Sequence, residues 1–214
     1  MTKKIEVIEN ILDENDRIAL ETQKNLSERG IFCINVMGAP GVGKTSVMKQ
    51  IAQRAAFKPY VIEGDIESDL DTAALNALGI NTVQINTHGA CHLDAPSIQT
   101  ALKEVKSLQD GVLFIENIGN LVCPAEFNIG EHAKMLIVST TDGSDKPYKY
   151  PLAFEKADLI ILNKNDLTPY LDFDYDFFLK GVLLQNKNAT VIRVSARTGE
   201  GFDDVVTWIE RARG

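Results

Sequence analysis

The octapeptide GAPGVGKT, residues 38–45, constrains the fold of this chain more than any other segment. It directly follows the apolar run Ile31–Met37 and precedes a stretch with helical periodicity, the setting that the pattern G-x-x-x-x-G-K-S/T requires. In such a loop, backbone N–H groups, a lysine and a helix N-terminus all face phosphate oxygens. The segment therefore predicts nucleotide binding through six residues: Gly38, Gly41, Gly43, Lys44, Thr45 and Ser46. Thr45 is expected to bind Mg²⁺ through its hydroxyl.

Short apolar runs alternate with amphipathic stretches along most of the chain. The runs predict about seven strands: Ile31–Met37, Pro59–Ile62, Thr82–Ile85, Val112–Ile115, Met135–Val138, Leu159–Leu162 and Thr190–Val194. The stretches predict helices over Thr45–Ala55, Asp69–Leu78, Pro96–Leu108, Leu152–Ala157 and Phe202–Ala212. Because parallel strands need crossover connections, this order indicates an α/β fold, a three-layer P-loop NTPase with a mainly parallel sheet.

We expect residues 1–30 to form an N-terminal segment of one or two helices and residues 31–214 to form the P-loop domain.

Composition and charge limit the classes of partner that the protein can bind. A formal net charge of -8 argues against a nucleic-acid or anionic-membrane partner, since such proteins gather Lys and Arg against phosphates. No apolar run approaches the roughly 20 residues that span a bilayer, and the first residues do not resemble a signal peptide. A cytoplasmic location is expected.

Two segments near the C-terminus indicate which base is bound. The tetrapeptide NKND, Asn163–Asp166, follows a predicted strand and fits the N-K-x-D element of GTPases, in which the Asp accepts hydrogen bonds from N1–H and the amine of guanine. Adenine offers no such donor pair and would leave a carboxylate unpaired. Ser195 and Ala196, in the SAR segment after the last strand, resemble a companion base-contacting element. Asn163, Lys164, Asp166, Ser195 and Ala196 are therefore predicted to bind GTP or GDP.

The catalytic residues are less regular than the phosphate loop. Lys44 is expected to stabilise phosphate charge, and Glu116 closes the apolar run Val112–Ile115, where an acid usually approaches Mg²⁺. Of the two candidate acids, Asp65, after the strand Pro59–Ile62, is preferred as the one linked to Mg²⁺, whereas Glu116 is expected to position Mg²⁺ through water or to orient the attacking water. Because the sequence shows neither a water-orienting glutamine nor an arginine finger, we predict that GTP hydrolysis is slow.

A thiol and an imidazole are adjacent in THGACHLDA, residues 87–95. Cys91 and His92 lie in a loop before a helix that is expected to begin near Asp94 to Ser97, and Cys123 lies in a second loop, after the Glu116 strand. Both loops leave the carboxyl edge of the sheet, as the phosphate loop does. Two thiols and an imidazole suit tetrahedral Zn²⁺ or square-planar Ni²⁺ and leave a fourth position open. Cys33, inside the first strand, is interpreted as a small buried hydrophobic residue.

The combined motifs resemble a known family. GAPGVGKT, GDIESDLD, CHLDA, ENIGNLVCPAEFNIGE, TTDGSDKPYKYP and NKND follow one another as in HypB, a family of GTPases that assist nickel insertion into NiFe-hydrogenase. The resemblance implies that Cys91, His92 and Cys123 bind Ni²⁺ or Zn²⁺ at the interface of a GTP-dependent homodimer. It also suggests that Lys146 or Lys149 contacts the nucleotide across that dimer, and Lys146 is preferred; a solvated loop lysine is the alternative. The implied partners are a nickel-delivery protein and the hydrogenase large subunit.

The sequence departs from the family pattern at two places. It lacks the cysteine-rich N-terminal motif or histidine-rich tract of many relatives, which argues against high-affinity nickel storage. His88 occupies a position where the family usually has glycine, and both an added ligand and a simple loop substitution remain open. Three other functions also stay open: a metal-binding adaptor with incidental hydrolysis, a GTPase serving urease, and a small-molecule kinase. The urease motif Cys-Pro-His is absent.

Overall fold

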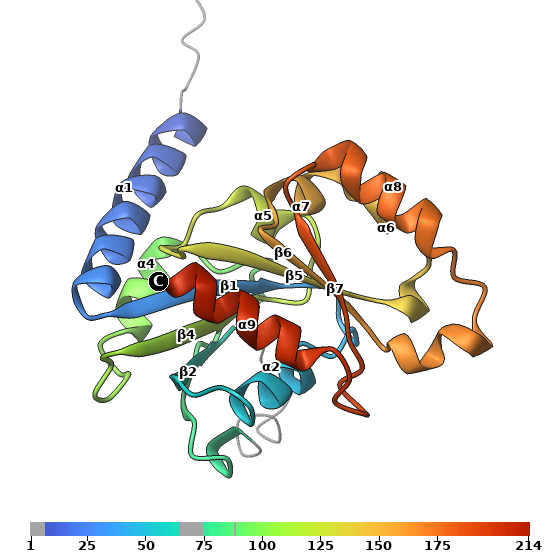
Figure 1. The fold of residues 1–214 in the computed structure, drawn as a ribbon. Coiled ribbons are helices and arrows are strands. Elements are labelled where there is room, and N and C mark those ends of the chain that lie inside the picture. Colours follow the sequence, from blue (N-terminus) through green and yellow to red (C-terminus); the bar gives the residue numbers. More distant parts are fainter. Residues whose placement is uncertain (1–6, 65–74, 88) are drawn as a thin grey trace, which may run out of the picture.

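A computed structural model describes residues 7–64, 75–87 and 89–214 of the chain. Its centre is a parallel sheet of seven strands in the order β3-β2-β4-β1-β5-β6-β7 (Figure 1). The strand bounds are β1 Ile31–Met37, β2 Lys58–Glu63, β3 Asn81–Gln84, β4 Gly111–Glu116, β5 Ala133–Ser139, β6 Leu159–Asn163 and β7 Thr190–Arg193. The predicted α/β fold with seven mainly parallel strands is therefore confirmed.

Burial on both faces of the sheet explains why the central strands are continuous apolar runs in the sequence. Every residue of β4, β5 and β6 is buried, whereas the edge strands β3 and β7 are only partly covered. A strand that is covered on both faces needs apolar side chains on both faces, so it loses the alternation of a half-exposed strand. The apolar runs in the sequence therefore mark the middle of the sheet most clearly.

Helices cover both faces of this sheet and complete the three layers (Figure 1). The helices α2 and α9 share a hydrophobic core with one face, and α1, α4, α7 and α8 pack over the other. The described helical bounds are α1 Val7–Glu28, α2 Lys44–Ala52, α4 Ala95–Ala101, α5 Cys123–Glu126, α6 Lys146–Lys149, α7 Pro151–Lys156, α8 Tyr175–Gln185 and α9 Phe202–Arg213. Short 3₁₀ helices span η1 Thr140–Asp142 and η2 Asn165–Tyr170.

The predicted helices differ from the structure in one place, and one further helix was not predicted. The helix expected over Pro96–Leu108 ends at Ala101, after which the backbone tightens into turns and reaches a positive φ of 54° at Ser107. The helix α8 was not predicted, because its sequence YDFFLKGVLLQ is apolar on nearly every side and shows little helical periodicity. The N-terminal segment forms the single helix α1, which ends before Gly30 at a φ of 69°. Most of the predicted helix Asp69–Leu78 lies outside the described residues.

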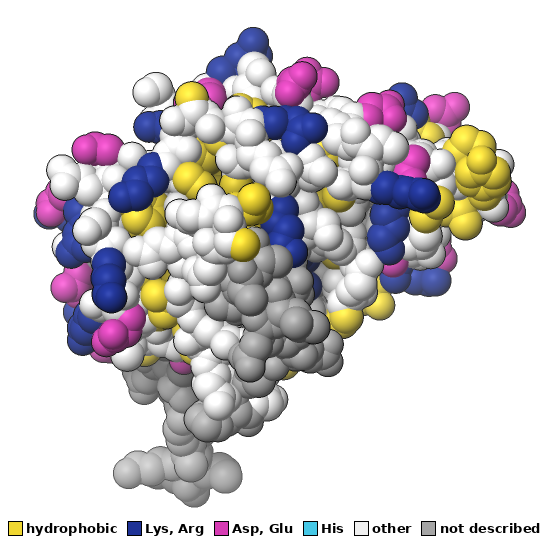
Figure 2. Space-filling model, turned by 90° about the horizontal axis from the view of Figure 1, so that it is seen from below, with side chains coloured by type: hydrophobic (Ala, Val, Ile, Leu, Met, Phe, Trp, Pro, Cys, Tyr) yellow, Lys and Arg dark blue, Asp and Glu magenta, His cyan; other side chains and the backbone are white. Residues whose placement is uncertain are grey.

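The surface carries charge of both signs. Figure 2 shows basic and acidic side chains interspersed over the face seen from below, with no broad area of one sign. Among the described helices, none combines the length and the apolar character needed to cross a membrane.

Candidate functional site

The phosphate loop joins β1 to α2, as the sequence predicts. Gly43 caps α2 in a left-handed conformation with a φ of 93°, and a Cβ at this position would lie 2.7 Å from Nδ2 of Asn163. Glycine is therefore needed at position 43 both for the left-handed turn and for the close approach of the Asn163 side chain. Lys44 and Thr45 then begin α2 at the carboxyl edge of the sheet, the edge at which ligands bind in open α/β folds.

A buried glutamate lies against the start of α2. Glu116, at the end of β4, is 5% exposed, and its carboxylate accepts a hydrogen bond from Thr45 Oγ1 at 3.3 Å. Lys44 Nζ lies 4.0 Å from the same carboxylate. The structure thus brings together three of the residues predicted for phosphate, Mg²⁺ and catalysis. Asp65, the preferred second acid, lies outside the described residues.

A second buried acid was missed by the sequence analysis. Glu63 ends β2, is 4% exposed and pairs in register with Glu116 on the neighbouring strand. The available signal was a charged residue closing an apolar run, since YVIE ends as LFIE does. Two carboxylates on adjacent strand ends concentrate negative charge beside the phosphate loop, which favours a divalent cation there.

The predicted base-contacting residues meet the phosphate loop. The Asn163 side chain donates to the carbonyl oxygen of Val42 at 2.8 Å and accepts from the backbone N–H of Ala196 at 3.0 Å. Lys164 Nζ donates to the carbonyl oxygen of Gly41 at 2.8 Å. The two C-terminal segments are therefore hydrogen-bonded to each other and to the loop that curls round the phosphates.

A cavity of about 320 Å³ opens between these segments. Asp166 reaches it from the start of η2, and its carboxylate accepts a hydrogen bond from Ser195 Oγ at 2.6 Å. This bond orients the carboxylate while leaving its second oxygen able to accept from a ligand. The cavity is lined by Gly43, Ser46, Asn163, Lys164, Asp166, Leu167, Ala196 and Arg197.

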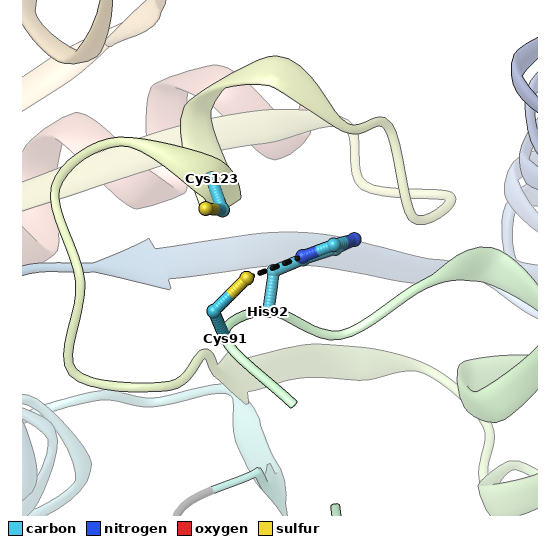
Figure 3. Close-up of side chains that lie close together, drawn as sticks. All are labelled: Cys91, His92 and Cys123. Carbon is cyan, nitrogen blue, oxygen red and sulfur yellow. Dashed lines mark hydrogen bonds between the residues drawn. The ribbon is translucent and has the colours of Figure 1, made fainter. Parts of the chain in front are cut away.

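Cys91, His92 and Cys123 converge from two loops (Figure 3). Their ligand atoms all lie within 4.8 Å of one another, and Cys91 Sγ is 3.3 Å from His92 Nδ1. Two sulfurs that bind a single tetrahedral Zn²⁺ lie about 3.8 Å apart at the usual metal–sulfur distance of about 2.3 Å. The three side chains are therefore close enough to share one ion after small shifts of their ligand atoms.

Local structure explains how these loops are held. Asp94 caps α4, with its carboxylate accepting from the Ser97 N–H at 2.9 Å, so the helix begins where the sequence analysis expects. The His92 ring stacks on Phe127 with their centroids 3.9 Å apart. Cys123 begins the short helix α5. His92 is thereby fixed in the same small region as both cysteines, although Cys91 itself is exposed.

Cys123 affects the protonation of Cys91. A hydrogen bond with Cys123 raises the pKa of the Cys91 thiol above its ordinary value, and desolvation raises it further. A metal that binds these sulfurs must displace their protons, so binding releases protons and strengthens as the pH rises. Cys33 is fully buried in β1, and burial raises the pKa of its thiol, in agreement with the interpretation that it is a core residue.

The group of Cys91, His92 and Cys123 lies beside the phosphate loop. Gly38 pairs with Asn120 in an isolated antiparallel bridge, and Asn120 Nδ2 donates to the carbonyl oxygen of Cys91 at 3.3 Å. A Cβ on Gly119 would lie 2.8 Å from the Pro40 ring, so only glycine allows this close approach. The segment between Glu116 and Cys123 therefore contacts the phosphate loop through Gly119 and Asn120, and it contacts Cys91 through the Asn120 side chain.

Lys146, which the family resemblance implicates in nucleotide contact, and His132 make other contacts. Lys146 begins α6 with its ammonium group 5.3 Å from the centre of the Tyr150 ring, within its own helical region. His132 is half-buried, accepts from the Cys33 N–H through Nδ1 at 2.9 Å, and lies 2.8 Å from Ser27 through Nε2. His132 is thus occupied by structural contacts. His88 lies outside the described residues.

Comparison with known proteins agrees with this arrangement. A family model described as the CobW/HypB/UreG nucleotide-binding domain matches residues 32–193. A hydrogenase maturation factor HypB from Azotobacter vinelandii is 46% identical over 215 residues, covering 100% of this chain and 71% of that protein.

Two solved structures are similar over nearly the whole chain. Hydrogenase maturation factor HypB from Archaeoglobus fulgidus superposes with a TM-score of 0.88 at 35% identity, over 95% of this chain and 100% of that one. HypB from Helicobacter pylori, solved in complex with nickel, gives a TM-score of 0.89 at 31% identity over 94% and 95%. With its phosphate loop in the expected fold and this identity over its full length, the chain belongs to the HypB family of hydrogenase maturation factors.

Proposed function

We propose that this protein is a GTPase that carries nickel for insertion into NiFe-hydrogenase and couples the state of its nucleotide to metal binding or release. The observation that carries this proposal is the position of the Cys91–His92–Cys123 group beside the phosphate loop, joined to it through the segment after Glu116. Two sites that share a structural segment can influence each other's affinity, and such coupling is reciprocal.

The nucleotide side of the proposal rests on Asp166 and the residues around it. The guanine edge would enter the cavity of about 320 Å³ that Asp166 lines, with Asn163 holding the loops on either side. Lys44 would contact the phosphates, and the hydroxyl of Thr45 with the Glu116 carboxylate would hold Mg²⁺, directly or through water. Bound Mg²⁺ neutralises phosphate charge. Asp65 remains part of this proposal.

The metal is proposed to be cargo. Two thiolates and one imidazole accept either Ni²⁺ or Zn²⁺, and the nickel complex of the Helicobacter pylori relative favours nickel. Three ligands from one chain leave room for a ligand from another molecule, and Cys91 is exposed. We therefore propose that a second copy of the chain completes the site in a GTP-dependent homodimer.

The dimer also supplies a role for Lys146. In the single chain its ammonium group lies over the Tyr150 ring and is half-buried, so it is held near the surface of α6. A partner chain placed against this surface would bring Lys146 towards the nucleotide and add positive charge at the phosphates. Slow hydrolysis by the isolated chain, faster in the dimer, would follow.

The delivery steps involve other proteins. A nickel-delivery protein and the hydrogenase large subunit are the proposed partners, and the proposed setting is the cytoplasm. The membership in a family of hydrogenase maturation factors supports these partners. Whichever partner accepts the ion must offer ligands that compete with two thiolates and an imidazole.

A single titration tests the coupling. Ni²⁺ is added to the reduced protein with GDP and, separately, with a non-hydrolysable GTP analogue, while thiolate-to-nickel absorption and molecular mass by light scattering are recorded. The proposal expects bands that depend on Cys91 and Cys123, an affinity that differs between the two nucleotide states, and a mass that doubles with the analogue. An equal affinity in both states, with GTP hydrolysis unaffected by metal, would instead support a metal-binding adaptor.

A further inference from the structure

Two buried asparagines connect the two segments that carry the proposed metal ligands. We call residues 91–95 the first ligand segment, which carries Cys91 and His92, and residues 118–128 the second ligand segment, which carries Cys123. Each of these asparagines, Asn15 and Asn117, forms one side-chain hydrogen bond to the backbone of the first ligand segment and one to the backbone of the second.

Asn15 lies in α1, far from both segments in sequence. Its side chain is 5% exposed, and Oδ1 accepts from the Ala95 N–H at 2.9 Å. Nδ2 donates to the carbonyl oxygen of Asn128 at 2.8 Å. One amide therefore ties the end of the first ligand segment to the end of the second.

Asn117 makes the equivalent connection at the other end. It is fully buried, and its Oδ1 accepts from the Leu93 N–H at 3.1 Å and from the Ile118 N–H at 2.9 Å. Its Nδ2 donates to Asn35 Oδ1 on β1 at 3.1 Å, which fixes the amide to the sheet. The residue directly after His92 and the first residue of the second ligand segment thus share one acceptor.

These contacts act on backbone groups that have few alternatives. Leu93 and Ala95 are 2% and 0% exposed, and Ala95 is the first residue of α4, where the N–H has no partner inside the helix. A buried N–H that loses its acceptor is driven to move towards water or another partner. Moving Ala95 or Asn128 would shift His92 or Phe127, whose rings are stacked.

We propose that Asn15 and Asn117 are positioning residues that hold Cys91, His92 and Cys123 in metal-binding geometry. The ligand side chains are exposed or only half-buried, so core packing does not fix them and the backbone of the two segments must. Mutation of a residue that orients metal ligands commonly lowers the affinity for the metal about 10-fold to 100-fold. The inference rests on the proposed metal site and adds α1 as its support.

Asn15 offers the cleaner test, because Asn117 is adjacent to Glu116 and its replacement would disturb the phosphate loop. Ni²⁺ is titrated into GDP-bound, reduced wild-type protein, N15A and N25A, with thiolate-to-nickel absorption as the readout. Asn25 is an exposed residue of the same helix and serves as the matched control. N15A is expected to bind Ni²⁺ about 10-fold to 100-fold more weakly, with weaker bands at saturation, whereas N25A stays within about twofold of wild type.

The affinity for GDP is measured on each variant, because a role confined to overall folding would lower both affinities together. N15D keeps the side-chain volume and the acceptor towards Ala95 but loses the donor towards Asn128, so its Ni²⁺ affinity is expected between those of N15A and wild type. If N15A fails to bind GDP, N15D decides the question. Wild-type Ni²⁺ affinity in the variant that folds would overturn the inference.

The outcome also separates this inference from the proposed function. If wild-type protein shows no Ni²⁺ binding that depends on Cys91 and Cys123, the proposed function itself fails. If wild type binds and the Asn15 variants bind equally well, only the positioning role fails.

Discussion

Replacing Asp166 by asparagine should change which base the protein binds. The structure supports one acceptor oxygen held by Ser195 at 2.6 Å and a second that is able to face a ligand in the adjoining cavity. Asparagine keeps the acceptor for Ser195 but presents an amide where guanine needs a carboxylate. The fold should therefore survive, while the donors N1–H and the exocyclic amine lose their shared acceptor.

The size of the effect follows from the two lost hydrogen bonds. A hydrogen bond to a charged group contributes about 1.5–3 kcal/mol, so two contribute about 3–6 kcal/mol. At about 1.4 kcal/mol per factor of ten, D166N should bind GDP about 10²-fold to 10⁴-fold more weakly than wild type. Xanthosine diphosphate, which has a carbonyl in place of the amine, should recover much of the loss because asparagine can donate to that oxygen.

Competition against fluorescently labelled GDP measures these affinities. D172N is the matched control, since Asp172 is exposed in the same region of the chain and undergoes the same change of charge. A D166N protein that binds GDP within about threefold of wild type, or that gains nothing from xanthosine diphosphate, would refute the assignment of Asp166 to the base.

Three further predictions concern the cation, the thiols and pH. Glu116→Gln removes the charge next to Thr45 and should raise the Mg²⁺ concentration for half-maximal GDP binding about tenfold or more, measured by titration; an unchanged midpoint would exclude Glu116 from the site. Cys123→Ala should weaken Ni²⁺ binding at least about tenfold, whereas Cys33→Ala, in the core, should leave it unchanged while lowering thermal stability; equal Ni²⁺ affinities in the two variants would contradict the assignment. Desolvation lowers the pKa of His132 from its ordinary value, so the unfolded chain binds this proton more readily. The contribution of His132 to the free energy of unfolding should be complete above pH 6.5 and decline as the pH falls through the lower folded pKa. Urea unfolding between pH 8 and pH 5 should show this decline in wild type and a smaller one in His132→Gln.

The sequence predicted most of the fold because the relevant signals are local. The runs that became β4, β5 and β6 are buried on both faces, and continuous apolar character is what such strands require. Where apolar residues are only partly covered by the rest of the protein, the hydrophobic pattern in the sequence is a weaker guide to secondary structure. The helix α8 escaped prediction because large apolar residues such as Phe177 and Leu184 remain exposed on it, which hides the helical period.

The site was predictable to a similar degree. The glycines and lysine of the phosphate loop, the NKND segment and the cysteine–histidine pair are short motifs whose chemistry can be recognised without coordinates. Glu63 was missed because a single acid at a strand end is not distinctive until the neighbouring strand brings Glu116 beside it. Only the tertiary structure shows that both ring nitrogens of His132 are occupied, by Ser27 and by the Cys33 N–H.

By itself, the sequence determined the α/β class, the nucleotide loop and the residue types able to hold a soft metal, and its NKND segment predicts guanine binding. Only the tertiary structure decided that Cys91 and Cys123 share one small region, that this region touches the phosphate loop, and that Asn15 reaches across from α1 to hold it. The physical reason is how far apart along the chain the interacting residues lie. Strand, helix and loop motifs are set by neighbours within a few residues, whereas the hydrogen bonds of Asn15 join groups 80 and 113 residues apart and leave no periodic trace in the chain.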